Sequence, residues 1–432
     1  MKTDVVLEPL DKQTSFAPLC VLGYCLTRTG FLKPYWSQIQ CRMKTREHEP
    51  VEKLQDLLVS ILAGNESVSQ INTHIRPDQP LADCWGRDCF AEQSSVARTL
   101  DALTGEQVEQ LQQANLDLVR QYSRTWKHDF KQGYLLLDID PTFLPASRLA
   151  EGSRKSYTAG KKNQYGRQWV RIGAPTYHET LCSLLFPGNQ QGCTTLKPAV
   201  RVIQDFLGLS QQQIQRTILR SDASLGTDGN INWLLWSGYQ VLMKGFSGSR
   251  AVSQAKRVQE QDWLADPQRK RWIARAPDPP RFAKRTRVFS LRWKNKADLR
   301  YGTLISSLID LGPLSTLRLH DGRGAIEVEI KADKQGLKAT KRRKKSLAAQ
   351  TGLILLTDLA HNLLSWTHHW VLEGGPFDSF GAKRMVEELL GMPGRIEVKG
   401  HQLQKVALPE KHPYAQEMRS VVLKLLDFFG NP

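Results

Sequence analysis

The period of the hydrophobic pattern changes near residue 134. Before this point apolar residues recur at intervals of three and four, as from Leu54 to Leu62, which predicts helices, the first of them ending near Gly64. After it, short apolar runs alternate with helical segments. The predicted order is strand 134–140, strand 169–174, strand 181–186, helix 194–207, strand 217–222, helix 231–236 and strand 239–244. A helical N-terminal region followed by an α/β domain is therefore expected.

The helical region contains a candidate DNA-reading motif. Ser94 or Ser95 is expected to cap a short helix, with Val96, Leu100 and Leu103 facing inward and Arg98, Thr99 and Asp101 facing outward. Thr104-Gly-Glu-Gln107 then predicts a capping box that opens a longer helix through about Tyr122. This layout fits a helix-turn-helix in which Arg98 faces DNA. Plain packing of helices fits nearly as well.

The C-terminal part is predicted to contain a buried helix, a hairpin and an amphipathic helix. The hairpin is expected from Ile396 to Val406 and the amphipathic helix from Tyr414 to Phe429. The most apolar segment, Leu353 to Trp370, contains one Asp and three His, so it predicts a buried helix and not a membrane span.

Two features concern the cellular compartment. The N-terminus carries Asp4 and Glu8 before any apolar run, which does not resemble a signal peptide. The chain has seven cysteines, and without a secretory signal they indicate a reducing compartment, so a cytoplasmic location is expected. The C-x4-C spacings at Cys20/Cys25 and Cys84/Cys89 give only weak support to a zinc site, because structural zinc pairs are usually more closely spaced.

The charge balance favours a polyanionic partner, nucleic acid before a membrane surface. The chain has 60 Lys and Arg against 43 Asp and Glu, a net charge of +17. Residues 256–300 carry 14 of these cations against 5 acids, with aromatic residues between them, including Trp272 and Trp293. Such a segment can follow a phosphate backbone and stack on unpaired bases. Alternatively, it is a basic β-rich insertion whose aromatic residues form its own small core.

A second basic run, 338–345, holds six cations in eight residues. It follows a candidate site helix directly, which makes Lys341, Arg342 and Arg343 candidate DNA contacts. A merely solvated run is the alternative.

The segment from His320 to Lys334 gathers charges on one face if it forms a helix. At about 100° per residue, four cationic or titratable residues fall within roughly 40° of Glu327. They are His320, Arg323, Lys331 and Lys334. A carboxylate flanked by cations suits a metal ligand beside a phosphate-bearing substrate. The alternative is a solvated helix with ion pairs Arg323–Glu327 and Glu327–Lys331.

Two further carboxylates, Asp140 and Asp222, follow predicted strands. Gathering three acids is unfavourable, since two unit charges about 4 Å apart repel by roughly 1 kcal/mol in water and about 4 kcal/mol at a dielectric of 20. A pair of Mg²⁺ ions would reverse that sign and serve a phosphoryl transfer. Asp138 competes with Asp140, since both point to the same side of one strand. Asp140 is preferred, because it lies nearer the strand's end and is followed by Thr142.

These residues carry a family resemblance. The order of elements resembles the ribonuclease H-like fold. His320-x2-Arg323-x3-Glu327-x6-Lys334 is similar to the Y-x2-R-x3-E-x6-K signature of DDE transposases from bacterial insertion sequences, with His in the Tyr position. The sequences around Asp140 and Asp222, and the apolar Leu359–Leu364, are also similar to family segments. The resemblance covers about residues 85–370.

The resemblance implies roles for particular residues. Asp140, Asp222 and Glu327 would be the catalytic metal ligands for two Mg²⁺ or Mn²⁺ ions. Arg323 and Lys334 would position DNA phosphate near the cut, and His320 could donate a hydrogen bond to phosphate with a charge that varies with pH. Trp272 or Trp293 would stack on a flipped base.

The resemblance also implies an architecture. It is an α/β fold with a helical N-terminal DNA-binding region (1–130), a ribonuclease H-like catalytic domain (131–370) and a C-terminal hairpin and helix (371–432). A basic β-rich insertion at about 246–315 precedes the last catalytic helix.

The expected function is a transposase that binds the terminal inverted repeats of its element. It would hydrolyse the end phosphodiester and transfer the freed 3′-OH to target DNA. Double-stranded DNA is the expected partner, with a dimer on DNA, no membrane, and a bacterial cytoplasmic location at the nucleoid. A ribonuclease H-like structure-selective nuclease and a non-catalytic DNA-binding protein, such as an inactive transposase relic, are the alternatives.

Overall fold

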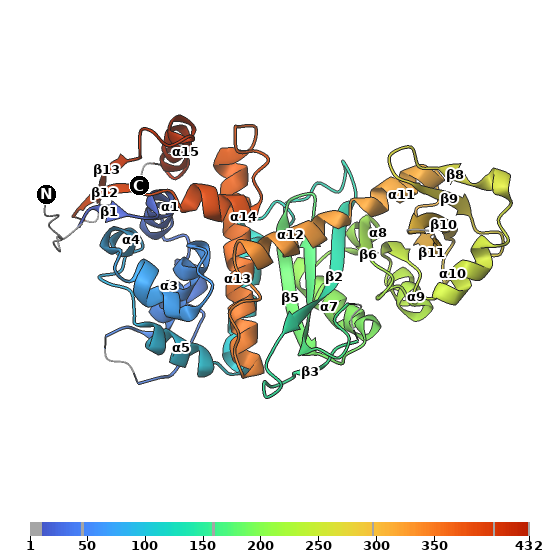
Figure 1. The fold of residues 1–432 in the computed structure, drawn as a ribbon, viewed down its shortest axis with the longest axis horizontal. Helices are drawn as coiled ribbons and strands as arrows, with labels where there is room; N and C mark the ends of the chain where they lie inside the picture. Colours follow the sequence, from blue (N-terminus) through green and yellow to red (C-terminus); the bar gives the residue numbers. More distant parts are fainter. Residues whose placement is uncertain (1–10, 45–46, 158–159, 296–297, 401, 431–432) are drawn as a thin grey trace, which may run out of the picture. The chain divides into compact units, whose positions relative to one another are not determined.

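The chain folds into two compact units in the computed structural model (Figure 1). The structure describes residues 11–44, 47–157, 160–295, 298–400 and 402–430. One unit comprises Met1–Leu118 and Lys331–Pro432, and the other comprises Val119–Ile330. These limits do not coincide with the predicted domain boundaries at 130 and 370.

The unit Val119–Ile330 is built on a mixed sheet. Its central strands have the order β5-β4-β2-β6-β7. Strands β2, β6 and β7 run parallel, and β4 runs antiparallel to both β2 and β5. The bounds are β2 Leu135–Pro145, β3 Arg154–Lys155, β4 Tyr165–Ala174, β5 Glu179–Pro187, β6 Thr217–Ser221 and β7 Gln240–Lys244. This is the ribonuclease H-like arrangement, so the predicted fold class is confirmed.

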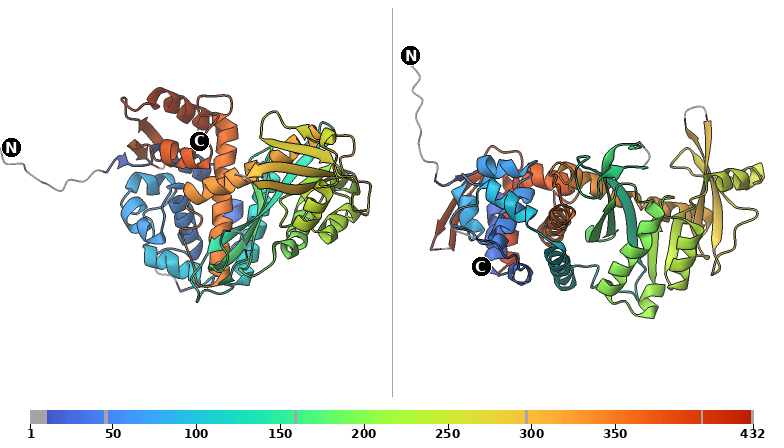
Figure 2. Two further views of the ribbon diagram at one scale, coloured as in Figure 1. Left: turned by 45° about the vertical axis from the view of Figure 1, so that its right-hand side comes forward. Right: turned by 90° about the horizontal axis from the view of Figure 1, so that it is seen from below.

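Helices cover both faces of this sheet (Figure 2). One face carries α7 (Gly192–Leu207) and α9 (Asp228–Trp236), with α8 (Gln211–Gln215) nearby in the chain. The other carries α11 (Pro313–Asp321) and the beginning of α12 (Gly324–Gln335). Because side chains alternate along a strand, the buried Leu135, Leu137 and Ile139 share one face of β2 while Asp138 and Asp140 face α11 and α12.

Strand β2 extends past the predicted end at Pro141. The strand pairs with β6 only as far as Ile139, but its pairing with β4 continues to Pro145. A proline has no backbone N–H to donate, and beyond Ile139 the strand has a partner on one side only, so Pro141 is tolerated there. The prediction that this strand ends at residue 140 was therefore wrong.

The basic insertion continues the main sheet. Strand β11 pairs antiparallel with β7, which extends the order to β7-β11-β10-β9-β8. The bounds are α10 Gly248–Ala255, a 3-10 turn Glu260–Asp262, β8 Leu264–Ala265, β9 Arg271–Arg275, β10 Arg287–Asn295 and β11 Asp298–Ser306. The predicted β-rich insertion is confirmed.

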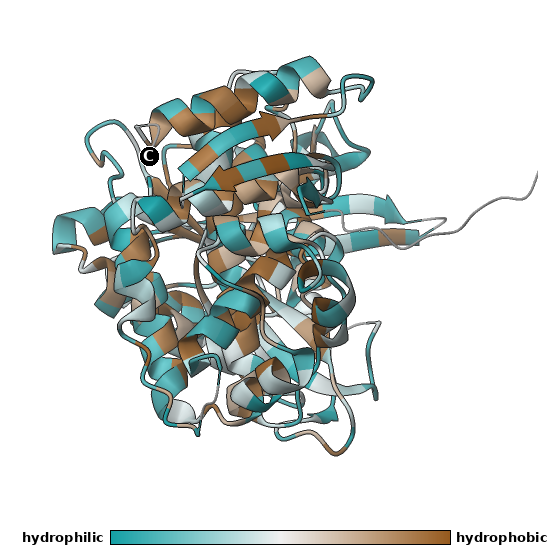
Figure 3. Cartoon of the chain, turned by 90° about the vertical axis from the view of Figure 1, so that its left-hand side faces the viewer, coloured by the Kyte–Doolittle hydropathy of each residue, from teal (hydrophilic) through white to brown (hydrophobic). Residues whose placement is uncertain are grey.

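The other unit is mostly helical, with a small sheet of order β1-β12-β13. Its longer helices carry alternating hydrophilic and hydrophobic segments (Figure 3), as expected where amphipathic helices share a core. The strands are β1 Gln13–Thr14, β12 Gly394–Lys399 and β13 Gln402–Ala407. The helices are α1 Ala17–Arg28, α2 Lys33–Trp36, α3 Pro50–Leu62, α4 Gln79–Cys84, α5 Gln93–Asp101, α6 Gly105–Tyr122 (as far as Leu118), α13 Leu347–Thr367, α14 Ala382–Arg384 and α15 Ala415–Phe428. Shorter helical turns are Val68–Gln70, Ile71–Ile75, His368–Leu372 and Met385–Leu390.

Most predicted helices of this unit are confirmed, with two corrections in α5. The N-cap residue is Glu92, not Ser94 or Ser95. Thr99 is buried, and its hydroxyl donates to the Ser95 carbonyl (3.1 Å), because a threonine that bonds back to its own helix can face inward. The predicted start of α6 is confirmed, since the Thr104 N–H donates to Gln107 Oε1 (3.1 Å). Among the described residues no helix is long and apolar enough to span a membrane.

The turn after β6 leads to a prediction about stability. A Cβ built on Gly226 would lie 1.8 Å from the Lys244 carbonyl oxygen, whereas one on Gly229, in α9, has open space around it. We expect Gly226→Ala to lower the free energy of unfolding by about 1–3 kcal/mol, because the backbones must separate. Gly229→Ala is the matched control and should be neutral or slightly stabilising. Urea denaturation of both variants measures this; equal stability of the two would contradict it.

Candidate active site

The charged residues near α12 lie at two levels of the sheet. The first level holds Asp138 and Arg220, and the second holds Asp140 and Asp222. Asp138 on β2 lies beside Arg220 on β6 in the parallel register. Asp140 lies two residues further along β2, on the same face. Asp222 follows the last residue of β6. The second level therefore lies where the parallel strands end, which is where ligand sites of open α/β sheets form.

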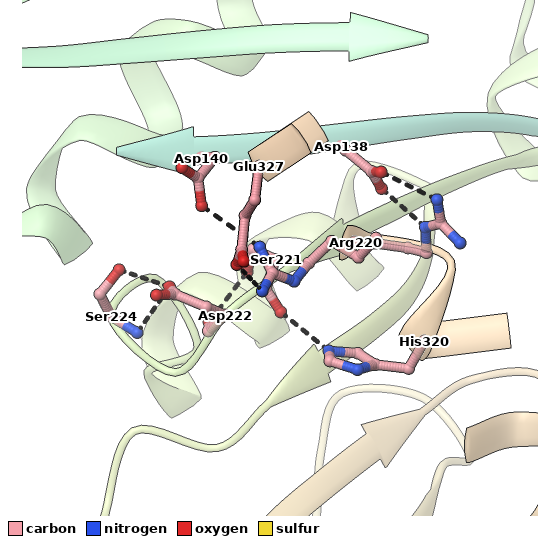
Figure 4. Close-up of polar contacts among 9 residues, drawn as sticks. Asp138, Asp140, Arg220, Ser221, Asp222, Ser224, His320 and Glu327 are labelled. Carbon is pink, nitrogen blue, oxygen red and sulfur yellow. Dashed lines mark hydrogen bonds and ion pairs between the residues drawn. The ribbon is translucent and has the colours of Figure 1, made fainter. Parts of the chain in front are cut away.

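Asp138 is committed to a buried ion pair. Both of its carboxylate oxygens accept from Arg220, at 2.6 Å from Nε and 2.8 Å from Nη2, and neither side chain is exposed (Figure 4). Burial raises the pKa of Asp138 to about 6, although Arg220 acts in the opposite direction. Both oxygens of Asp138 are therefore occupied by Arg220. This favours Asp140 over Asp138 as the candidate metal ligand, a choice that the sequence left open.

Asp140 and Glu327 share one guanidinium group. Arg323 Nη1 lies 3.2 Å from Asp140 Oδ1, and Nη2 contacts Glu327 Oε1 (Figure 4). Burial acts to lower the pKa of Arg323, yet its hydrogen bond to Glu327 and the charges of Glu327, Asp140 and Asp222 outweigh burial and raise that pKa. The Arg323–Glu327 ion pair, which the solvated-helix alternative predicted, is present, and the bond from Arg323 to Asp140 connects this segment to β2.

Asp222 is oriented by the turn that follows it. Its Oδ1 accepts from the Ser224 backbone N–H (2.9 Å) and from the Ser224 hydroxyl (2.5 Å). Both bonds go to one oxygen of the carboxylate. The charge of Asp222 also contributes to the raised pKa of Arg323, whereas direct contacts to this guanidinium group come from Asp140 and Glu327.

The segment from His320 to Lys334 is not one helix. Helix α11 ends at Asp321 and α12 begins at Gly324, with a turn at Gly322 and Arg323. His320 therefore does not continue the face of Glu327, and this prediction was wrong. A glycine weakens a helix enough for tertiary contacts to decide whether the helix continues.

His320 faces the sheet interior. It is 3% exposed, and its Nε2 lies 3.3 Å from the Ser221 carbonyl oxygen. Because a carbonyl only accepts, Nε2 carries the proton. Burial and the nearby charge of Lys244 lower the pKa of His320 to about 3. The expectation that its charge varies near neutral pH was wrong, because a buried imidazole beside a cation stays neutral.

Lys244 is a residue that the sequence analysis missed. It is the last residue of β7, and since Ser221 pairs with Met243, it continues the row of Asp140 and Asp222. Burial and the charge of Arg323 lower its pKa, whereas Asp222 and Glu327 oppose the shift. The sequence did offer one signal for Lys244: it ends the predicted strand 239–244, the next strand after the one that leads to Asp222.

The two predicted stacking residues lie within the insertion's own packing. Trp293 packs against the core around Phe289 and Leu304, and Trp272 packs against the cluster of Trp263 and Ala274. Both are half-buried. This placement fits the alternative in which the aromatic residues form a local core.

The other candidate DNA contacts lie in the helical unit. Arg98, Lys331, Lys341 and Arg343 are exposed, and Lys334 is half-buried. Arg342 is 3% exposed, and its guanidinium donates to the Asn65 and Leu337 carbonyls, while burial lowers its pKa to about 9. Arg342 therefore holds its own loop and does not face solvent as predicted, since its planar head fits two backbone acceptors.

The donor set at α12 consists of carboxylates, the ligands that Mg²⁺ and Mn²⁺ prefer. Within the described part of the chain, no three His, Cys, Asp or Glu side chains lie close enough to hold a metal ion together. Arg323 separates Asp140 from Glu327 in this arrangement. The residue types therefore fit a divalent cation, and the three acids can share one only if Arg323 turns away.

Sequence comparison identifies the family. A family model described as "Transposase DDE domain group 1" matches residues 14–428. The chain belongs to the DDE transposase family. The predicted DDE transposase family is thus confirmed, and membership makes the protein a DNA transposase in its broad class; an origin in a bacterial insertion sequence stays a prediction. No curated protein sequence matches the chain.

Two solved structures are similar to this DDE transposase. The piggyBac transposase synaptic complex with hairpin DNA shares 12% identity over 88% of this chain and 81% of that chain, with a TM-score of 0.47. A pre-cleavage Mos1 transpososome shares 15% identity over 47% of this chain and 60% of that chain, with a TM-score of 0.18.

The environment of His320 predicts a pH effect on stability. An unfolded histidine titrates near pH 6.5, and in the folded chain the pKa is about 3. The unfolded state therefore binds the extra proton, so stability is present above about pH 6.5 and is lost as the pH falls below it. We expect the wild type to lose more unfolding free energy between pH 7 and pH 5 than His320→Gln, whose amide can still donate to Ser221.

Urea denaturation at several pH values measures this difference. If His320→Gln shows the full wild-type slope, the neutral buried state of His320 is refuted.

Proposed function

We propose that this transposase cuts the phosphodiester bond at its element's ends and joins the freed 3′-OH to target DNA, using Asp140, Asp222 and Glu327. The observation that carries the proposal is that Arg323 contacts both Asp140 and Glu327, while Asp222 directly follows the strand next to β2, in a chain that belongs to the DDE transposase family. They come from β2, from the turn after β6 and from α12, in the order that the family signature predicts.

The three acids would hold two Mg²⁺ or Mn²⁺ ions. When bound, such ions activate water and stabilise the attacking and leaving oxygens of a phosphoryl transfer. Arg323 has to leave the space between Asp140 and Glu327 for this to happen. A DNA phosphate offers its guanidinium a new bidentate partner, because phosphate oxygens match the guanidinium fork as carboxylates do.

Lys244 would bind a phosphate oxygen beside Asp222. Lys244 continues the row of Asp140 and Asp222, so its positive charge lies where a phosphate bound beside these acids would be, and attraction between opposite charges strengthens when water is displaced. The exposed cations of the insertion would add binding to the DNA backbone, which is not sequence-specific. A dimer on double-stranded DNA is proposed, because a transposition event has two element ends.

The first test replaces each acid by its amide. We expect Asp140→Asn, Asp222→Asn and Glu327→Gln each to lower end cleavage by at least about 100-fold while keeping DNA binding, since each removes a ligand charge and little volume. The substrate is the DNA that flanks the transposase gene, with Mg²⁺ or Mn²⁺. Asp205→Asn, an exposed acid on α7, is the matched control.

Three outcomes separate this proposal from its rivals. Cleavage by all three amide variants at wild-type rates would exclude the assigned site. Cleavage without any joined product in a strand-transfer assay would indicate a nuclease. Tight DNA binding without cleavage under any metal condition would indicate a non-catalytic relic, for which His320→Tyr, restoring the signature residue, is the variant to compare.

The second test concerns Lys244. We expect Lys244→Gln to lower kcat for end cleavage by about 10- to 100-fold, the value of one charge-assisted hydrogen bond, with KM for DNA nearly unchanged. Lys244→Arg should recover part of the loss. Lys197→Gln, on the opposite face of the sheet, is the control. Wild-type kcat in Lys244→Gln would remove Lys244 from the site.

A further inference from the structure

The end of α11 and the end of β6 are joined by two reciprocal bonds. Arg220, on β6, donates from Nη1 to the Leu319 carbonyl of α11. His320, the next residue of α11, donates from Nε2 to the Ser221 carbonyl of β6 (3.3 Å; Figure 4). Each element thus holds the backbone of the other by a buried side chain.

Arg220 is also held by Asp138 on the neighbouring strand β2. The two bonds that Arg220 donates to Asp138 fix the orientation of its guanidinium group, because a bidentate pair fixes a plane as well as a distance. Burying such a pair is costly, and apolar residues of similar volume often stabilise a core as well. The pair is therefore poorly explained by stability alone. Its third bond, to Leu319, connects it to the chain that leads into α12.

Gly322 shows how closely this group fits under the turn. A Cβ on Gly322 would lie 2.9 Å from Arg220 Nη1. The φ of Gly322 is −55°, which any residue can adopt, so the glycine is required by space and not by backbone conformation. The guanidinium group of Arg220 thus supports the turn that separates α11 from α12, directly before Arg323.

A third consecutive residue of α11 is held from the insertion. The carboxylate of Asp321 accepts from both Nη atoms of Arg271 on β9, and Arg271 Nε also donates to Asp266 (2.7 Å). Leu319, His320 and Asp321 are therefore fixed one after another, two from the central sheet and one from the insertion. Arg323 lies two residues beyond Asp321, in the turn, and Glu327 lies six residues beyond it, in the first turn of α12.

We propose that Arg220, Asp138 and His320 form a positioning clamp that sets Arg323 and Glu327 against Asp140 and Asp222. The clamp residues touch neither substrate nor cation. They act by fixing where α11 ends and α12 begins. The expected effect on DNA cleavage rests on the proposed function, whereas the fixed position of the turn between α11 and α12 rests on the contacts described above. The competing explanation is a buried ion pair that only stabilises the fold.

The test uses Arg220→Lys, which keeps the positive charge but cannot form the bidentate pair and the Leu319 bond together. Its matched control is Arg87→Lys in the other unit, where Arg87 forms a buried pair with Asp56 (Nε to Oδ1, 3.1 Å). Both variants lose a buried guanidinium group. Only one of them borders the site.

Three quantities are measured on the folded full-length variants. We expect Arg220→Lys to speed amide hydrogen exchange in residues 319–327 by at least 10-fold, to raise the half-saturating Mn²⁺ concentration in an electron paramagnetic resonance titration by at least 5-fold, and to lower kcat for end cleavage by at least 10-fold. Arg87→Lys should leave all three as in the wild type.

His320 supplies a second pair of variants, which keeps the inference testable if Arg220→Lys does not fold. His320→Ala should speed exchange in residues 319–327, and His320→Gln, whose amide can donate to Ser221, should restore slow exchange and Mn²⁺ affinity. If Arg220→Lys and Arg87→Lys have equal effects, or if His320→Ala leaves exchange unchanged, the clamp is refuted. Fast exchange in the clamp variants together with full cleavage by the three amide variants would refute the proposed function but keep the clamp.

Discussion

Repulsion among three carboxylates is the constraint on which the arrangement of this site depends. Asp140, Asp222 and Glu327 come from separate elements, and each pair of such charges would cost roughly 1–4 kcal/mol at contact distance, depending on the local dielectric. Arg323 offsets this by lying between two of them, and Lys244 adds a second cation beside Asp222. In the proposed reaction, the same cations would bind phosphate when metal ions neutralise the acids.

The sheet explains why these charges can meet. Parallel strands end at one edge, so residues just beyond Ile139, Ser221 and Met243 fall in one row without a need for long loops. The row before it holds the Asp138–Arg220 pair, whose polar groups are all engaged. Asp138 and Arg220 therefore have a structural role, whereas Asp140 and Asp222, each two residues further along the chain, lie on the side of α12.

Much of this could be predicted from the sequence, and the exceptions have physical reasons. Asp140 and Asp222 could be singled out because apolar runs ending in acids mark strand ends, and Glu327 because cations recur around it at helical spacing, and both signals are local. Lys244 was missed because its meaning depends on strand register, which one sequence does not contain. The break at Gly322 was missed because a glycine is tolerated in many helices, and here the space over Arg220 decides. Arg220 itself stands in an apolar strand, where its partner Asp138 is 82 residues away.

Charge density alone also misplaces the DNA contacts. In the sequence, the run 338–345 is more basic than any part of the insertion, yet the fold commits several of its cations to internal partners: Arg342 to two carbonyls, Lys344 to Asp101, and Lys338 to Glu66 and Glu387. A cation bound to an acid releases no counterion from DNA, so it contributes little to affinity. In the insertion, Arg281, Lys284 and Arg285 are exposed on the segment between β9 and β10. The exposed cations of the insertion, on the unit that carries Asp140, Asp222 and Glu327, are therefore the better candidates for DNA contacts in the proposed reaction.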